Sequence, residues 1–124
     1  MKPAVKPLDE DAEYFFAEGC FIVESSNSPQ DPALSVARAR VEPGRTTRWH
    51  YLEGITERYV ILAGEGDVEV GDLAATRVRP GDVVIIPPDE KQRIHNPGTE
   101  DLVFLALCTP RFVDSAYVDV ENQR

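Results

Sequence analysis

Residues 44–64 read GRTTRWHYLEGITERYVILAG, and this stretch decides the fold. A glycine stands at each end, and the part from residue 57 to residue 62 alternates between two faces. One face carries Glu57, Tyr59 and Ile61, and the other carries Arg58, Val60 and Leu62. A period of two is typical of a β-strand. The stretch therefore predicts a turn, a polar segment and a strand that ends at a second turn.

Similar short runs lie on both sides of this stretch. Further strands are predicted at Phe21–Glu24, Leu34–Glu42, Asp67–Val70, Val83–Ile86, Gln92–Asn96 and Leu102–Cys108. Most of the ten prolines and eight glycines fall between the runs, where they favour turns. Residues 83–86 are apolar without a break, which predicts a strand covered on both faces. Residues 116–120 are either an extra strand or an arm that covers a neighbour.

The strand pattern predicts one antiparallel β-sandwich or barrel. We expect an N-terminal arm at residues 1–10 and a single domain at residues 11–124, because 124 residues suffice for one core. The net charge of −9 argues against nucleic acid and anionic membranes as partners. Without a signal peptide or an apolar run long enough for a bilayer, the chain is expected in the cytoplasm. Cys20 and Cys108 are expected to be buried free thiols there.

Residues 44–64 resemble the first motif of the cupin superfamily. That motif places a glycine, two histidines, a glutamate and a second glycine at set spacings. Gly44, His50, Glu57 and Gly64 fall in four of these slots, and Leu52 stands in place of the second histidine.

Residues 81–96, GDVVIIPPDEKQRIHN, resemble the second cupin motif. Gly81, Pro87 and Asn96 match, while Asp89 replaces a glycine and Gln92 replaces a histidine. The two motifs together span a little under half of the chain.

The resemblance implies an all-β fold, an antiparallel double-stranded β-helix (a jelly-roll or cupin barrel) around one buried pocket. Cupin pockets usually hold Fe, Mn, Ni or Zn with three imidazoles and one carboxylate. Slot by slot, this leaves His50, Glu57 and Gln92 as metal ligands, since Leu52 cannot bind. An amide is a weak donor, so the expected cofactor is either none or one weakly held divalent metal. Strand alternation points His95 away from Gln92 and the pocket.

Four residues are candidates for catalysis or substrate binding in the pocket. His50 and Glu57 together could move a proton at neutral pH, because burial raises the pKa of a carboxyl unless a cation stabilises its charge. Tyr59 and Gln92 would orient the substrate. The alternatives are a structural His50–Glu57 pair and ordinary core packing for Tyr59.

The arginines and the tryptophan are assigned from strand alternation. Arg48 lies two residues before His50 and would share its face, where it could hold an anionic ligand; the alternative is a surface position. Trp49 points the opposite way, toward a dimer contact or the outer sheet. Arg38 and Arg40 face one side together, and one of them could reach the pocket, although exposure is the default for both.

Two functional hypotheses follow. The first is an enzyme that acts on a small polar or anionic metabolite as a dioxygenase, isomerase, lyase or hydrolase. The second is a non-catalytic barrel that has lost its metal site and binds a small molecule. In either case a homodimer is expected, because apolar outer faces of short strands favour pairing.

Overall fold

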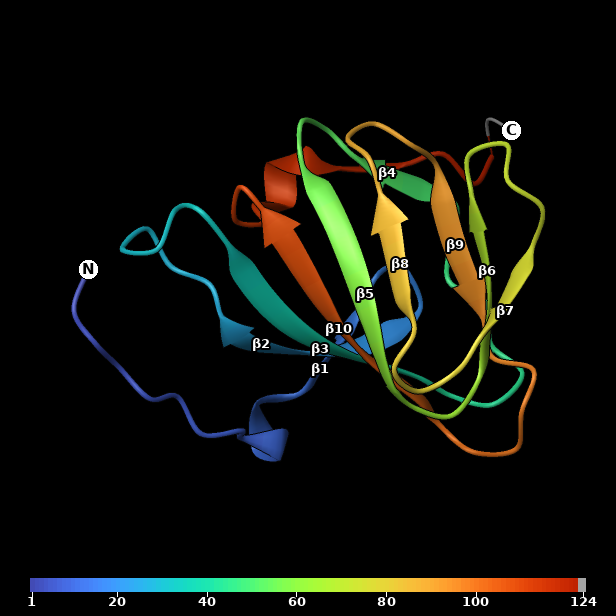
Figure 1. Ribbon diagram of the computed structural model, residues 1–124, viewed down its shortest axis with the longest axis horizontal. Helices are drawn as coiled ribbons and strands as arrows, with labels where there is room; N and C mark the ends of the chain where they lie inside the picture. The colour runs from blue at the N-terminus through green and yellow to red at the C-terminus, as the bar shows by residue number, and fades with distance from the viewer. Residues whose placement is uncertain (123–124) are drawn as a thin grey trace.

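The computed structural model describes residues 1–122, and strands joined by short turns make up nearly all of the ordered elements (Figure 1). The strands are β1 (Tyr14–Phe16), β2 (Cys20–Ser26), β3 (Ser35–Val41), β4 (His50–Leu52), β5 (Thr56–Ala63), β6 (Gly66–Val70), β7 (Thr76–Val78), β8 (Val83–Ile86), β9 (Gln92–His95), β10 (Leu102–Thr109) and β11 (Tyr117–Asp119). Two short 3₁₀ helices are η1 (Glu10–Ala12) and η2 (Asp114–Ala116). The last two residues of the predicted domain, 123 and 124, lie outside the described residues.

The strands form two facing sheets, which makes the molecule a β-barrel (Figure 1). One sheet has the order β1-β2-β3-β10-β5-β8, and the other has the order β11-β4-β9-β6-β7. Every strand pair is antiparallel. The predicted all-β antiparallel barrel is therefore confirmed.

The side chains that alternate along β5 point where the sequence predicts. Glu57, Tyr59 and Ile61 are buried inside the barrel, because β5 lies between β10 and β8 with one face toward the second sheet. The main core lies between the sheets and contains Cys20, Ile22, Ala39, Val41, Tyr59, Ile61, Val68, Val70, Val78, Val84, Ile86, Ile94, Leu102, Phe104 and Ala106. A smaller cluster of Leu52, Ile55, Cys108 and Ala116 closes one end.

The prediction that β8 is covered on both faces is wrong. Val84 and Ile86 are buried, but Val83 and Ile85 are 57% and 65% exposed. The strand lies at the edge of the six-stranded sheet, and its outer face carries no second layer of the described chain. One face of β8 therefore packs in the core, and the other face exposes apolar side chains to solvent.

The two ends of the described chain differ. Of the two alternatives for residues 116–120, the extra strand is the one formed, since β11 pairs with β4 of the same chain. Residues 1–9 precede the first element and are exposed, with Lys6 Nζ donating to Ser26 Oγ at 3.2 Å. Within residues 1–122, no helix is long and apolar enough to cross a membrane. The cytoplasmic location stays a prediction.

Three positions of the two motifs have clear structural roles. Gly64 has φ +76°, and a Cβ there would lie 2.5 Å from the Asp101 carbonyl oxygen. Asn96 is fully buried and its Nδ2 donates to the carbonyl oxygens of Val41 and Glu100. Asp89, which stands in the place of a motif glycine, has φ +67°. Asp89 thus has the left-handed backbone conformation that glycine readily adopts. This conformation costs aspartate less free energy than it costs most other residues.

Replacing Asp89 by alanine is expected to lower the free energy of unfolding by about 2 kcal/mol. The alanine Cβ is unfavourable at positive φ, and the hydrogen bond from the Gly54 N–H to Asp89 Oδ1 (3.0 Å) is lost. Glycine at the same position loses the bond but tolerates the backbone, so its cost should stay within about 1 kcal/mol. Urea denaturation of both variants measures this difference. Equal losses would mean that the side-chain bond, and not the backbone conformation, decides.

Candidate functional site

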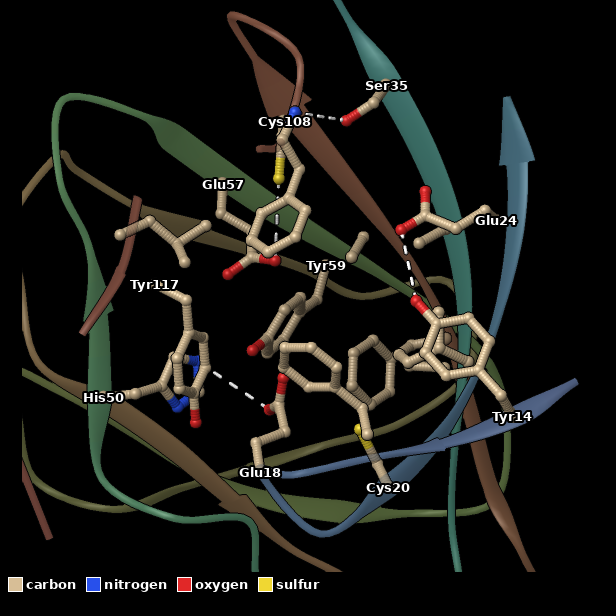
Figure 2. A pocket seen from close by; sticks show the side chains of 18 residues that line it. Tyr14, Glu18, Cys20, Glu24, Ser35, His50, Glu57, Tyr59, Cys108 and Tyr117 are labelled. Atoms are coloured by element: carbon tan, nitrogen blue, oxygen red, sulfur yellow. Dashed lines mark hydrogen bonds and ion pairs between the residues drawn. The ribbon is translucent and has the colours of Figure 1, made fainter. Parts of the chain in front are cut away.

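The barrel contains a cavity of about 560 Å³, counting its open mouth (Figure 2). Its polar lining residues are Tyr14, Glu18, Cys20, Glu24, Ser35, His50, Glu57, Tyr59, Cys108 and Tyr117, and the apolar ones are Phe16, Ile22, Ala37, Ala39, Leu52, Phe104, Ala106 and Phe112. At the more exposed end, the Tyr14 hydroxyl donates to Glu24 Oε1 at 3.4 Å. His50, Glu57 and Tyr59 all line this space, as predicted, so the structure brings three of the candidate residues together.

His50 opens β4 and its side chain is only 2% exposed. Its Nδ1 donates a hydrogen bond to the Arg48 carbonyl oxygen at 2.7 Å, which places the proton of the neutral ring on Nδ1. The ring stacks on Tyr117, with 4.9 Å between the centroids and 21° between the planes. Nε2 therefore faces Glu18, at 3.7 Å from Oε2, and is available for proton transfer.

Glu57 projects from β5 into the cavity and is 8% exposed. Gln92 Nε2 donates to its Oε1 at 2.7 Å, and the Cys108 thiol donates to its Oε2 at 3.7 Å. Burial raises the pKa of Glu57 to about 7, and the charge of Glu18 adds to the rise, while His50 and these two hydrogen bonds oppose it. Near neutral pH the carboxyl is thus poised between its protonated and charged forms.

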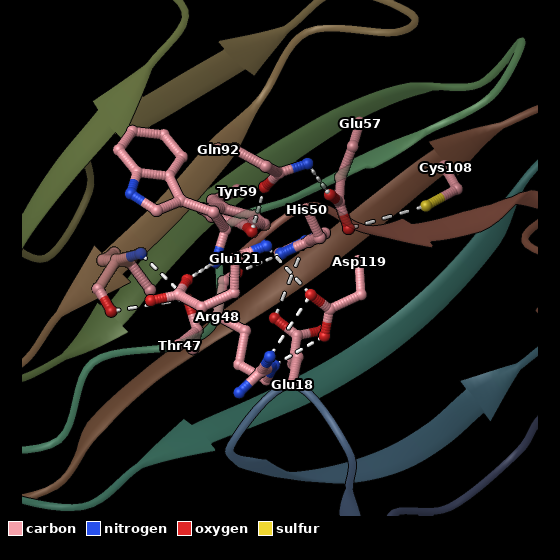
Figure 3. A network of polar contacts seen from close by, with 12 residues as sticks. Glu18, Thr47, Arg48, His50, Glu57, Tyr59, Gln92, Cys108, Asp119 and Glu121 are labelled. Carbon is pink, nitrogen blue, oxygen red and sulfur yellow. Dashed lines mark hydrogen bonds and ion pairs between the residues drawn. The ribbon is translucent and has the colours of Figure 1, made fainter. Parts of the chain in front are cut away.

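Gln92 does not line the cavity but contacts two residues that do, Tyr59 and Glu57 (Figure 3). Its amide oxygen accepts a hydrogen bond from the Tyr59 hydroxyl, and its amide nitrogen donates to Glu57. Burial raises the pKa of Tyr59 well above its usual value, so the phenol stays protonated as a donor. Gln92 therefore connects two lining residues rather than facing a ligand itself.

Glu18 is a lining residue that the sequence did not reveal. It sits in the turn between β1 and β2, outside both motifs, and its side chain is 14% exposed. The Arg48 N–H donates to the Glu18 carbonyl oxygen at 2.8 Å, which ties this turn to the chain before β4. Burial raises the pKa of Glu18, and His50 opposes this. No pattern in the sequence marks the contact, because it depends on how distant segments pack.

Arg48 does not share the face of His50, so this part of its prediction is wrong. β4 begins only at His50, and Arg48 therefore lies before the regular alternation. Its guanidinium forms an ion pair with Asp119 on the surface, with 2.5 Å between Nε and Oδ2 (Figure 3). Arg48 does not line the cavity.

Arg38 and Arg40 also stay outside the cavity. Arg38 lies 3.9 Å from Glu10, and Arg40 pairs with Glu13 and Asp101 while it covers the Phe21 ring. Both residues lie on β3 with side chains that are 21% and 24% exposed, so the expectation of full exposure is wrong, although neither residue lines the cavity.

Two further residues lie where alternation placed them. His95 points away from the cavity, and its Nδ1 lies 2.7 Å from the Thr46 hydroxyl. Trp49 packs on the outside of the five-stranded sheet, with the Arg93 guanidinium 4.5 Å from its ring centroid.

The residues present do not fit a resident divalent metal. Leu52 occupies one ligand slot, and both ends of the Gln92 amide are engaged by Tyr59 and Glu57. Among residues 1–122, no group of three His, Cys, Asp or Glu side chains is placed to hold a metal ion. The predicted set of His50, Glu57 and Gln92 is therefore not arranged as metal ligands, since Gln92 presents no free oxygen to the cavity.

The arrangement is suited to acid–base chemistry. His50 presents an accepting nitrogen, and Glu18 and Glu57 face the same space from two other strands or turns (Figure 2). Two buried carboxyl groups share one imidazole, so a proton gained by one group changes the pKa of the others. A ligand in the cavity would meet both a proton donor and a proton acceptor.

Comparison with known proteins relates the chain to the cupin family. A family model described as the Cupin domain matches residues 37–108. An oxalate-binding protein from Thermotoga maritima is 35% identical over 83 residues, which cover 67% of this chain and 68% of that protein.

Solved structures show the same fold. A predicted oxalate decarboxylase from Thermotoga maritima superposes with a TM-score of 0.67 at 29% identity, covering 73% of this chain and 80% of that one. A Cupin 2 conserved barrel domain protein from Salinispora arenicola superposes with a TM-score of 0.74 at 20% identity, covering 88% and 90% of the two chains.

Proposed function

The chain belongs to the cupin family, and from this premise we propose that its cavity binds a small organic molecule and exchanges protons with it through His50 and Glu57. The observation that carries the proposal is the orientation of His50. Its Nδ1 is held by a backbone carbonyl, which leaves Nε2 as an acceptor inside a cavity that also contains Glu57. Proton-transfer catalysis needs a group that accepts a proton and a group that donates one, and the pKa of Glu57, about 7, suits this exchange near neutral pH.

Among the predicted reaction types, an isomerase or a lyase fits these residues best. Both reactions can proceed by proton removal at one atom and proton delivery at another, and His50 and Glu57 supply one group for each step. A dioxygenase would need a redox metal, for which the donor set is unsuited. Tyr59 and Gln92 act here as positioning residues, because their hydrogen bonds hold the Glu57 carboxyl in place.

Deuterium exchange tests the proposal without knowledge of the full reaction. Small carbonyl and hydroxy compounds, among them dihydroxyacetone, lactaldehyde and glycolaldehyde, are incubated with the protein in D₂O and followed by proton NMR. We expect loss of the C–H signal next to the carbonyl in at least one compound, faster than in buffer alone. Binding of a compound without exchange would instead support the non-catalytic barrel, which the replacement of two motif histidines by Leu52 and Gln92 favours.

We also propose that the outer face of the six-stranded sheet pairs two copies of the chain. Val83 and Ile85 of β8 are exposed, and Val83 lies opposite Val60 of β5, which lies opposite Leu105 of β10. Val60 and Leu105 are half-buried, so the exposed Val83 and Ile85 continue into further apolar side chains on this face, and an apolar face of this kind favours association. We expect Ile85→Arg to convert a dimer to a monomer in light scattering after gel filtration, because it would bury two charges.

Leu73→Arg is the matched control for this prediction. Leu73 is also exposed but lies in the turn between β6 and β7, away from the six-stranded sheet. A dimer that survives Ile85→Arg, or a parent protein that is monomeric at micromolar concentration, would contradict the proposed interface.

A further inference from the structure

We infer that the cavity selects a small organic ammonium cation and rejects carboxylate anions such as oxalate. The inference concerns the class of ligand and rests on the proposed function only in using the same cavity. It departs from what the name of the Thermotoga maritima relative would suggest, and it is carried by the charges and rings that line this particular chain.

The charge of the lining is the first observation. Three carboxyl groups line the cavity, those of Glu18, Glu24 and Glu57, and the lining contains no lysine or arginine. The one cationic group available is the His50 imidazole, when protonated. A dicarboxylate would be repelled by these groups in their charged forms, which for Glu57 prevail above its pKa of about 7, because charges of one sign interact strongly where water is scarce.

The nearby arginines cannot correct this balance. Arg38, Arg40 and Arg48 each pair with a carboxylate on the outside of the barrel, and their partners include Glu10, Glu13 and Asp119. If one of these arginines turned into the cavity, its ion pair would break and the carboxylate on the surface would lose its cationic partner. The cavity therefore stays acidic in the folded protein.

The second observation is that two inner polar atoms, His50 Nε2 and Glu18 Oε2, form no hydrogen bond with any of the described residues. His50 Nε2 and Glu18 Oε2 are 3.7 Å apart, which is beyond hydrogen-bond distance. A ligand N–H group next to Glu18 would supply the missing hydrogen bond and also the missing positive charge.

The aromatic wall is the third observation. The rings of Phe16, Phe112 and Tyr117 surround the cavity beside Glu18, with 5.2 Å between the centroids of Phe16 and Tyr117 and 6.3 Å between those of Phe16 and Phe112. The faces of aromatic rings attract cations and disfavour anions. Carboxylate and aromatic groups together thus favour an ammonium group with a short alkyl chain.

Three probes of matched shape test the inference: butylammonium, butan-1-ol and butanoate, with oxalate as a fourth. Binding to the full chain is measured at pH 7.5 by isothermal titration or by ligand-observed NMR. We expect butylammonium to bind about tenfold or more tightly than butan-1-ol, with no measurable binding of butanoate or oxalate. Equal affinity for the alcohol, or tighter binding of either anion, overturns the inference.

Variants identify the residues that select the cation. Glu18→Gln should weaken butylammonium binding about tenfold and leave butan-1-ol unchanged, whereas Glu100→Gln, the same change at an exposed site, should alter neither. Phe16→Leu should weaken butylammonium binding about threefold and thereby provides a second test that does not remove a charge. Melting temperatures show that each variant is folded.

The binding assay separates this inference from the proposed function. Ammonium selectivity without deuterium exchange in any compound would support the inference and contradict catalysis. Exchange with a carbonyl compound combined with tight binding of butanoate would do the opposite.

Discussion

Replacing His50 by asparagine is expected to lower the rate of proton exchange between substrate and solvent by about 10²–10⁴-fold, the usual contribution of a positioned general base. Nε2 is the inward nitrogen of the ring, and asparagine has no group that can accept a proton in its place. The asparagine amide can still donate to the Arg48 carbonyl oxygen, so the local backbone contact is kept. We therefore expect the free energy of unfolding to change by about 1 kcal/mol.

His95→Asn is the matched control for this experiment, because the chain has two histidines and His95 faces away from the cavity. Exchange rates measured by proton NMR in D₂O should be unchanged in this variant. A rate that is equal in the parent and in His50→Asn would contradict the role of His50 as the base. A His50→Asn protein that unfolds would show a structural role instead, and circular dichroism detects this.

Stability should fall as the pH rises from 5.5 to 8, by about 2 kcal/mol from Glu57 alone. The pKa of Glu57 is about 7 in the folded protein, against 4.5 as its ordinary value. Between these two values the folded state binds more protons than the unfolded state, so stability is present at low pH and is lost as the pH rises through 7. The raised pKa of Glu18 acts in the same direction.

Glu57→Gln should remove most of this pH dependence, because glutamine does not titrate. Its amide oxygen can still accept from Gln92 Nε2, so the hydrogen bond is kept and the variant should be more stable than the parent at pH 8. Urea denaturation at pH 5.5, 6.5, 7.2 and 8 measures both proteins. A parent whose stability rises over this range would show that Glu57 is charged throughout.

Other carboxyl groups do not mask the effect. Hydrogen bonds from arginines hold the pKa values of Glu13, Asp67 and Asp119 below their ordinary values. Their contribution to stability is lost only when the pH falls below about 4.5, which is outside the measured window. The change between pH 5.5 and pH 8 therefore reports on the cavity.

Much of the barrel was predictable because a strand with one covered face has a period of two. The alternation in residues 57–62 placed Glu57 and Tyr59 inside, and the spacing of the motifs placed His50 beside them. The same reasoning was wrong for β8, where four apolar residues in a row contain no polar residue to mark the outer face. Arg48 was misplaced because alternation holds only within a strand, and β4 starts after it.

The sequence by itself determined the fold, the inward pair of His50 and Glu57 and the loss of two metal-ligand slots, because spacing and residue type are local properties. The tertiary structure alone decided that Glu18 and Tyr117, from opposite ends of the chain, meet His50, and that Gln92 faces Glu57 rather than a ligand. It also decided that the nearby arginines pair outside. The acidic, aromatic character of the cavity is therefore a property of the packed barrel, since it depends on contacts between segments distant in the chain.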